Sequence, residues 1–211
     1  NFRRKQEFVD RGIHRLVEVT QEDLKYAEAD EGLSPSQRQW MQVSGRWSGG
    51  QDFYLDRSLI AHEMAGWTFP LHFIDFETAR VAIPFHAGQR PYANIAFQFS
   101  HHEMQADGTV AHRSQFLSTT PGVRPKYEFV RQLQQAIGSR GTVFMWWPHE
   151  NTTLNAILEE LEEDPSPPAD AEQLKAFILD LTTGKANGVA RSGQRAMVDL
   201  CRLARLAFFH P

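Results

Sequence analysis

The run of residues 71–78, Leu-His-Phe-Ile-Asp-Phe-Glu-Thr, constrains the fold more than any other stretch of the chain. Its apolar and β-favouring residues before Asp75 are typical of a strand buried at the centre of a sheet. Residues two apart in a strand point to the same side, so the carboxylates of Asp75 and Glu77 project from one face, about 7 Å apart along the strand. We expect the rest of the fold to be arranged around this strand.

Two acids on one face of a buried strand need a compensating charge. Unpaired anions there repel each other and lose solvation, and a divalent cation bound between them removes both costs. Asp75 and Glu77 are therefore candidate ligands for Mg²⁺ or Mn²⁺. The alternative is that the strand ends at the surface, where each acid meets water or an arginine such as Arg80.

The overall composition limits the classes of function. A chain of 211 residues is long enough for one ordinary domain and a small addition. Its net charge of −4 excludes a globally basic nucleic-acid-binding protein, whereas a metal-dependent nuclease needs only an acidic centre and a local basic track. The single cysteine, Cys201, excludes an internal disulfide and favours a reducing, cytoplasmic compartment. No apolar run approaches the roughly 20 residues that cross a bilayer, so we expect no membrane partner.

Two parts of the chain differ in pattern. Residues 1–50 predict a small helical, hairpin-like module, and residues 51–211 predict a second domain, with a glycine-rich joint at 45–50 between them. In the module, the sequences at 20–23 and 34–37 each place a hydroxyl three residues before an acid or amide, the pattern of a capping box at a helix start. Basic and acidic residues balance there, so we expect a packing or linking role, with DNA binding or docking of a protein partner as the alternatives.

The second domain predicts a mixed sheet covered by helices, an α/β fold. Three strands joined by a loop and by the tight turn Asp107-Gly108 predict an antiparallel meander, and the helix–strand–helix pattern that follows predicts further, parallel strands. The expected strands are 71–78, 93–100, 110–117 and 142–147, and the expected helices are 56–66, 125–137, 151–162, 169–181 and one that opens at 197–200. The polar, glycine-rich segment 182–193 predicts a mobile loop.

A further acid, Glu150, follows the fourth expected strand directly. If that strand lies beside the first one, their ends bring Glu150 toward Asp75 and Glu77, and three carboxylates at one edge require a cation. The alternative is that Glu150 is an acid at a helix start, where the helix dipole favours negative charge.

These motifs together resemble a known family. The segments that carry the resemblance are Phe73–Thr78, Ile83-Pro84, Arg90–Tyr92, Phe97–His102 and Arg195–Leu200. They are similar to an uncharacterised bacterial family of the DEDD exonuclease superfamily, whose fold is ribonuclease H-like. Members commonly follow a RecB- or Cas4-like nuclease module, so the resemblance implies such a neighbouring domain.

The resemblance also implies roles for single residues. Asp75 and Glu77 match the first-motif metal ligands, and Glu150 stands where the superfamily has its second-motif aspartate, although the residues before it differ from the usual asparagine and aromatic. Asp199 matches a late acid of the family and is either a further catalytic candidate or a helix-start residue. The third motif, a tyrosine or histidine followed by an aspartate, has no match before Pro211, so the domain looks truncated at its C-terminal part.

The implied activity is that of a 3′–5′ exonuclease that uses Mg²⁺ or Mn²⁺ to hydrolyse phosphodiester bonds of DNA or RNA, single-stranded or at an end. Arg191, Arg195, Arg202 and Arg205 are candidates for holding phosphates, or form a solvated helix face. The rival function is a non-catalytic scaffold domain that binds nucleic acid or protein within a larger nuclease. A zinc site is not favoured, because the histidines at 101, 102 and 112 lack cysteine partners and an H-E-x-x-H pattern.

Overall fold

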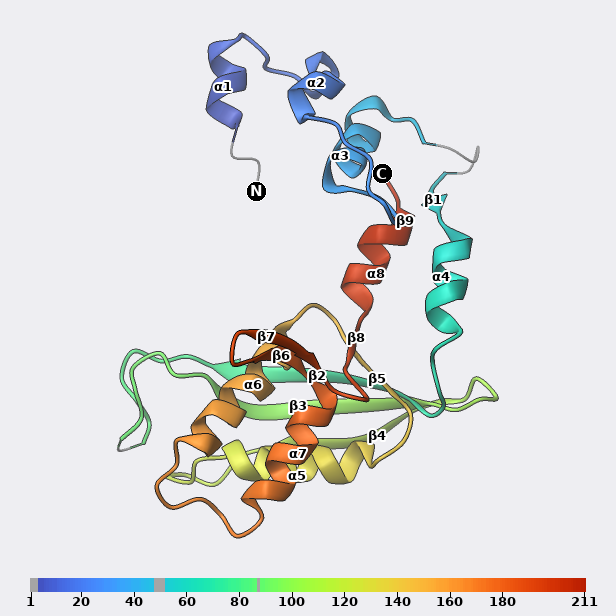
Figure 1. The fold of residues 1–211 in the computed structure, drawn as a ribbon. Helices are drawn as coiled ribbons and strands as arrows, with labels where there is room; N and C mark the ends of the chain where they lie inside the picture. Colours follow the sequence, from blue (N-terminus) through green and yellow to red (C-terminus); the bar gives the residue numbers. More distant parts are fainter. Residues whose placement is uncertain (1–3, 48–51, 87) are drawn as a thin grey trace. The chain divides into compact units, whose positions relative to one another are not determined.

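The computed structural model describes residues 4–47, 52–86 and 88–211, which form two compact units (Figure 1). The first unit comprises Asn1–Ala65 and Arg202–Pro211, and the second comprises Gly66–Cys201. This division differs from the expected boundary at residue 50, because long-range pairing adds segments to the first unit. Part of the expected joint at 45–50 lies outside the described residues.

The first unit holds short helices and a small two-stranded sheet. Its elements are α1 (Lys5–Asp10), the 3₁₀ helix Leu16–Glu18, α2 (Gln21–Leu24), α3 (Pro35–Ser44), α4 (Arg57–Met64), β1 (Tyr54–Leu55) and β9 (Phe208–Phe209), with most of α8 (Leu200–Ala207). Strand β1 pairs antiparallel with β9. The N–H of Leu33 also donates to the carbonyl of Leu206 at 2.8 Å. The C-terminal residues therefore close this unit rather than continuing the sheet of the second one.

Local start signals are confirmed in the first unit. The Thr20 hydroxyl accepts from the N–H of Asp23 at 3.3 Å, and the Ser34 hydroxyl accepts from the N–H of Gln37 at 3.0 Å. Both are capping boxes, and Pro35 occupies the first turn of α3. Such caps satisfy backbone donors that a helix start leaves unpaired.

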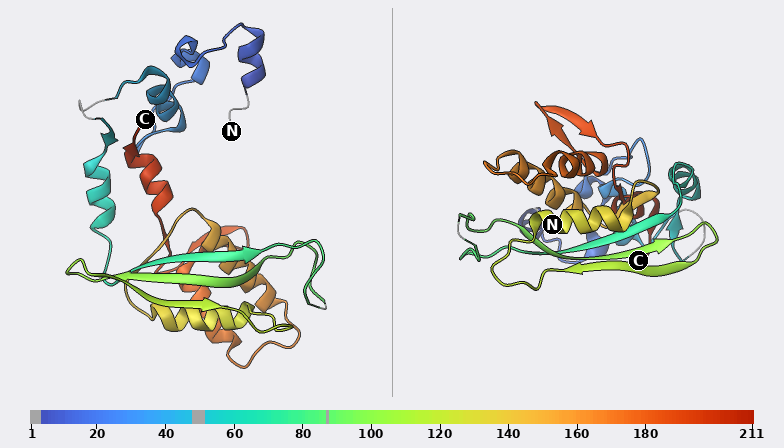
Figure 2. Two further views of the ribbon diagram at one scale, coloured as in Figure 1. Left: turned by 180° about the vertical axis from the view of Figure 1, so that it is seen from behind. Right: turned by 90° about the horizontal axis from the view of Figure 1, so that it is seen from below.

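The second unit is built on a five-stranded mixed sheet with the order β4-β3-β2-β5-β8 (Figures 1 and 2). The strands are β2 (Leu71–Ala79), β3 (Ile95–Met104), β4 (Val110–Leu117), β5 (Thr142–Met145) and β8 (Val198–Asp199). β2, β3 and β4 form the antiparallel meander, and β2, β5 and β8 run parallel. The expected α/β fold with a mixed sheet is confirmed, and β2 lies at its centre.

Three helices cover one face of this sheet, as Figure 2 shows. They are α5 (Lys126–Ile137), α6 (His149–Glu162) and α7 (Ala171–Leu181). Phe129 of α5 meets the rings of Phe76 and Phe99 edge to face, and all three side chains are buried. Full burial of each such side chain stabilises the fold by about 1.5–3 kcal/mol. The alternation of β2 leaves Asp75 and Glu77 exposed on the opposite face.

The segment 182–193 is ordered, contrary to expectation. It forms a hairpin of β6 (Thr183–Ala186) and β7 (Val189–Ser192), turned by Asn187 and Gly188, which both have positive φ. Asn-Gly is the preferred pair for such a two-residue turn. The side chain of Asn151 on α6 fixes the hairpin, because its Oδ1 accepts from the N–H of Thr183 at 2.9 Å.

Gly141 determines how closely β5 approaches β2. It has φ +88°, and a Cβ there would lie 2.1 Å from the carbonyl oxygen of Pro70. We expect Gly141→Ala to destabilise the protein by about 2 kcal/mol or more, in addition to the cost of placing alanine at a positive φ. The reason is that the added Cβ would overlap the backbone at Pro70, which must shift to make room. The control is Gly108→Ala, which has a similar φ but open space around it. Equal losses of unfolding free energy in urea for both variants would contradict this account.

Candidate functional site

Three carboxylates lie near the ends of parallel strands, and the charges of two of them, Asp75 and Asp199, act on the third, Glu150. Asp75 lies on β2, Glu150 lies in the first turn of α6 directly after β5, and Asp199 is the last residue of β8. Because β2, β5 and β8 are parallel neighbours, their carboxyl ends share one edge of the sheet. The predicted convergence of Glu150 with Asp75 thus has its basis in the topology. Asp199 joins them as the last residue of β8, directly before α8 begins at Leu200, as the expected helix start there predicts.

The short length of β5 makes room for Glu150. β5 pairs with β2 only from Leu71 to Phe73, whereas β2 continues to Ala79. After β5 the chain turns through Trp147, whose φ is +72°, and enters α6. The backbone N–H of Trp147 donates to Asp199 Oδ1 at 3.1 Å. A bulky residue in the left-handed region is uncommon, and this bond helps to hold it there.

The carboxyl group of Glu150 is buried, with a relative exposure of 2 %. Burial, together with the negative charges of Asp75 and Asp199, raises its pKa to about 7, although its own N–H and that of Phe76 act in the opposite direction. Its Oε2 is buried and has no hydrogen-bond partner among the described residues. The group therefore needs either a proton or a nearby cation.

Glu77 shares the exposed face of β2 with Asp75, as the strand alternation predicts. A β-bulge between Glu77 and Thr78 changes the pairing with β3 at this point. Bulges next to functional sites redirect side chains. The arginine that the alternative invoked is engaged elsewhere, since Arg80 Nε donates to the carbonyl of Tyr92 at 3.1 Å.

His149 is a residue of this region that the sequence did not single out. It precedes Glu150, and its Nε2 lies 3.3 Å from the hydroxyl of Thr78, one residue after Glu77. Its position beside a candidate acid was the only signal that could have identified it. An exposed imidazole here can exchange a proton with water.

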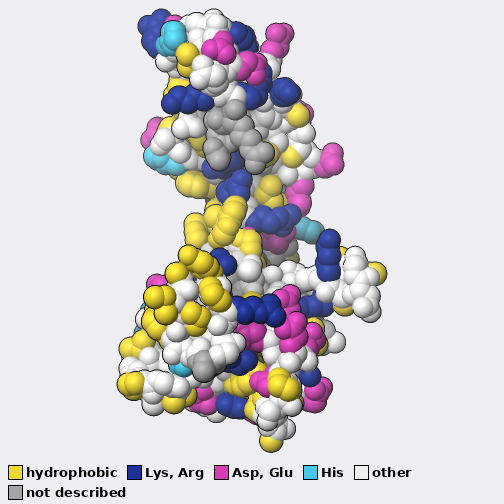
Figure 3. Space-filling view, turned by 90° about the vertical axis from the view of Figure 1, so that its left-hand side faces the viewer, with side chains coloured by type: hydrophobic (Ala, Val, Ile, Leu, Met, Phe, Trp, Pro, Cys, Tyr) yellow, Lys and Arg dark blue, Asp and Glu magenta, His cyan; other side chains and the backbone are white. Residues whose placement is uncertain are grey.

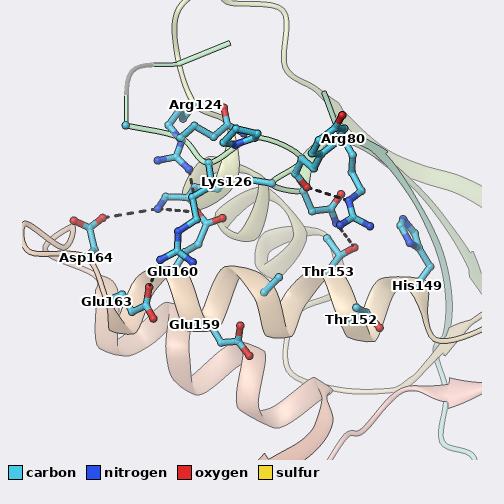
Figure 4. Close-up of a pocket in the computed structure, with 18 of the residues that line it drawn as sticks. Arg80, Arg124, Lys126, His149, Thr152, Thr153, Glu159, Glu160, Glu163 and Asp164 are labelled. Atoms are coloured by element: carbon cyan, nitrogen blue, oxygen red, sulfur yellow. Dashed lines mark hydrogen bonds and ion pairs between the residues drawn. The ribbon is translucent and has the colours of Figure 1, made fainter. Parts of the chain in front are cut away.

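A pocket of about 640 Å³ extends from His149 along α6 (Figure 4). Arg80 and His149 lie at one end, and Glu163 and Asp164 lie at the other. Its cations are largely paired, because Lys126 and Arg124 reach Glu160 at 3.0 and 3.1 Å. Figure 3 shows Lys and Arg side chains beside Asp and Glu side chains on the lower half of the face in view, with hydrophobic side chains next to them. The pocket is polar without being strongly basic.

The predicted phosphate-binding arginines have structural partners. Arg191 donates to the carbonyl and hydroxyl of Thr182 and contacts Asn155. Arg195 donates to the carbonyls of Gly138, Arg140 and Gly141. Arg202 and Arg205 lie on α8 in the part assigned to the first unit. Phosphate binding by these residues stays a prediction, and the bonds of Arg191 and Arg195 do not favour it.

The raised pKa of Glu150 predicts a pH-dependent stability. Its ordinary value is 4.5, so between that value and about 7 the folded state holds a proton that the unfolded state releases. The stabilisation is present at low pH and is lost as the pH rises through this window, by about 3 kcal/mol. Glu150→Gln should remove this loss, as measured by urea unfolding at pH 4 and pH 8.

The matched control is Glu159→Gln on the same helix, where the side chain is exposed. It should keep the pH dependence of the parent protein. If the unfolding free energies of Glu150→Gln and the parent changed with pH in the same way, Glu150 would have the same pKa in the folded and the unfolded state.

Comparison with known proteins gives one match. The model of a family described as a domain of unknown function, DUF2779, matches residues 72–211, which include the acids at 75, 77, 150 and 199. Neither the curated proteins nor the solved structures contain a match. Within the part of the chain that the structure describes, no helix has both the length and the apolar character needed to cross a bilayer. Since the matched region covers more than half of the chain, this protein belongs to the DUF2779 family.

Proposed function

We propose that the second unit is a ribonuclease H-like nuclease domain that uses Mg²⁺ or Mn²⁺ to hydrolyse phosphodiester bonds of DNA or RNA. The observation that carries the proposal is the meeting of Asp75, Glu150 and Asp199 at one edge of the sheet, with a buried oxygen of Glu150 left without a partner. A structural protein gains nothing from such an arrangement, because a buried carboxyl among other acids destabilises the fold.

The sheet supports the fold part of this proposal. An antiparallel meander followed by two strands parallel to its first strand is the arrangement that the sequence resemblance implies. Asp75 stands on the first strand of the meander, Glu150 in the first turn of the helix that follows β5, and Asp199 at the end of β8. Fold alone does not establish an activity, so the proposed chemistry rests on the acids.

The donor set fits a hard divalent cation. Carboxylate oxygens are the ligands that Mg²⁺ and Mn²⁺ prefer, and Asp75, Glu77 and Glu150 would supply them, with Asp199 beside them. When bound in such a site, divalent cations lower the pKa of an attacking water and offset the charge on the leaving oxygen. The orphaned oxygen of Glu150 needs either a proton or a cation, and a divalent ion would supply the second.

The residues of the chain itself have separable tasks. Glu150 must release its proton before it can bind a cation, so binding should strengthen as the pH approaches 7. His149 is placed to accept a proton from water, and the Thr78 hydroxyl at 3.3 Å holds its ring. The exposed cation Arg90, whose closest ion pair is 3.8 Å long, lines the pocket beside α6 and is available to a phosphate.

A scaffold function is the second candidate, and one observation favours it. Arg191, Arg195 and Lys126 use their donors within the protein, which leaves the region less basic than a nucleic-acid groove usually is. In this case the domain would bind nucleic acid or protein for a neighbouring module, and the RecB- or Cas4-like nuclease implied by the resemblance is the proposed neighbour.

We expect Mn²⁺ to bind the protein, and Asp75→Asn to weaken this binding. Mn²⁺ should also take the place of the proton on Glu150. The unfolding free energy should therefore fall less between pH 4 and pH 8 when Mn²⁺ is present. Hydrolysis of a labelled single-stranded DNA or RNA should fall at least about 100-fold in Asp75→Asn, since even partners outside the metal shell affect activity 10–100-fold.

Electron paramagnetic resonance of bound Mn²⁺ and gel assays of the labelled strand provide the two measurements. Glu159→Gln, an exposed change on α6, is the control and should behave as the parent. Manganese bound at these acids without hydrolysis of either strand would favour the scaffold function. Equal manganese binding and equal activity in Asp75→Asn and the parent would refute the metal-dependent nuclease.

A further inference from the structure

A second group of ligand-type side chains lies on the helix-covered face of the sheet. His72 lies on β2, and His101 and Glu103 lie two residues apart on β3, so the latter two share one face. His72 pairs with Glu103 in the antiparallel register. The two histidines are 2 % and 0 % exposed, and the Glu103 side chain is 12 % exposed. Buried polar groups in such a place require compensation.

The potential ligand atoms converge on one point. His72 Nδ1 lies 3.0 Å from His101 Nε2 and 3.7 Å from Glu103 Oε2, and one atom from each residue falls within 4.8 Å of the others. Zinc bonds of 2.0–2.1 Å in tetrahedral geometry place ligand atoms about 3.3 Å apart. The two nitrogens already have nearly this separation, and the Glu103 oxygen, 3.7 Å from His72 Nδ1, is the ligand atom that has to move closer.

Each histidine uses its other nitrogen for a fixed hydrogen bond. His72 Nε2 lies 3.0 Å from the carbonyl of Arg140, which can only accept, so this nitrogen carries the proton and Nδ1 presents a lone pair to the cluster. His101 Nδ1 lies 3.0 Å from the Ser114 hydroxyl. Metal-binding histidines almost always have such a partner on the second nitrogen, which fixes the tautomer and the ring.

Glu103 is oriented in a similar way. Its Oε1 accepts from Gln105 at 2.6 Å and forms an ion pair with Arg113 Nε at 3.2 Å, while Oε2 faces the lone pair of His72 Nδ1. A β-bulge between His101 and His102 shifts the pairing with β4 beside this cluster. A carboxylate oxygen opposite an imidazole lone pair is repulsive, and a cation between the two atoms makes the contact favourable.

We propose that His72, His101 and Glu103 bind a Zn²⁺ ion that links β2 to β3. Two imidazoles and a carboxylate form a ligand set that zinc accepts. The site is independent of the acids at the end of β2, because His72 and Asp75 lie on opposite faces of the strand. The metal-free alternative is a chain of hydrogen bonds from Ser114 through His101 and His72 to the carbonyl of Arg140, and the experiment distinguishes the two.

The test uses the whole chain, stripped with a chelator and titrated with Zn²⁺ alone. We expect one zinc per chain by mass spectrometry. At a hundredfold excess over the Kd, zinc should raise Tm by at least about 5 °C, because binding to the folded state alone stabilises it. Co²⁺ in the same site should show the visible absorption of tetrahedral cobalt.

His101→Gln and Glu103→Gln should each weaken zinc binding at least 100-fold. Glu103→Gln keeps the volume of this partly exposed position, so it remains informative if His101→Gln does not fold. The matched control is His102→Gln, the exposed neighbour on β3, whose ring lies beside His112.

Two results would overturn the proposal. The first is a parent protein that binds no zinc at micromolar concentration and keeps the same Tm, which would establish the metal-free hydrogen-bond chain. The second is equal zinc binding by Glu103→Gln and the parent, because the ion would then lie elsewhere.

Discussion

The central position of β2 is the constraint from which the rest of the second unit follows. β2 is hydrogen-bonded to β3 on one side and to β5 on the other, so its two faces are fixed relative to the helices. One face carries Ile74 and Phe76 into the core under α5, and the other carries Asp75 and Glu77 out of it. The burial of Ile74 and Phe76 stabilises β2, and this stability keeps the acids on its other face in fixed positions.

Glu150 shows what this arrangement costs. A carboxyl that is 2 % exposed and near two other acids is destabilising when it is ionised, and the neighbouring N–H groups compensate only in part. Natural proteins keep such local conflicts mainly where a function requires them. His72 and His101 are buried polar groups on the other face, and each has close polar partners within the protein.

Local signals predicted much of the fold. The capping boxes at Thr20 and Ser34, the alternation in β2 and the helical spacing of α5 each depend on residues close in sequence. The segments that were predicted wrongly depend on distant partners. β8 consists of two residues and exists only because β5 lies beside it. Residues 101–104 continue β3 because β2 and β4 pair with them, although the sequence suggested that the strand closes there.

The candidate sites were likewise predictable only where the signal was local in the sequence. Asp75 and Glu150 were recognisable because each lies next to an apolar strand, and topology then decided whether they met. The bonds of Arg191 and Arg195 within the protein were invisible in the sequence, since their acceptors are carbonyls at the ends of other elements. The grouping of His72 with Glu103 depends on strand register, which a sequence read one strand at a time does not determine.

The short β5 has a consequence for how the family can vary. Because β5 ends at Met145 while β2 continues, the four residues between Met145 and Glu150 act as a spacer of fixed length that brings α6 against the edge of β2. Their identities can differ among relatives as long as the turn at Trp147 is kept, but inserting or deleting one residue would change where α6 begins relative to β2 and move the acid away. Relatives that share this chemistry should therefore conserve the number of these residues more strictly than their kinds.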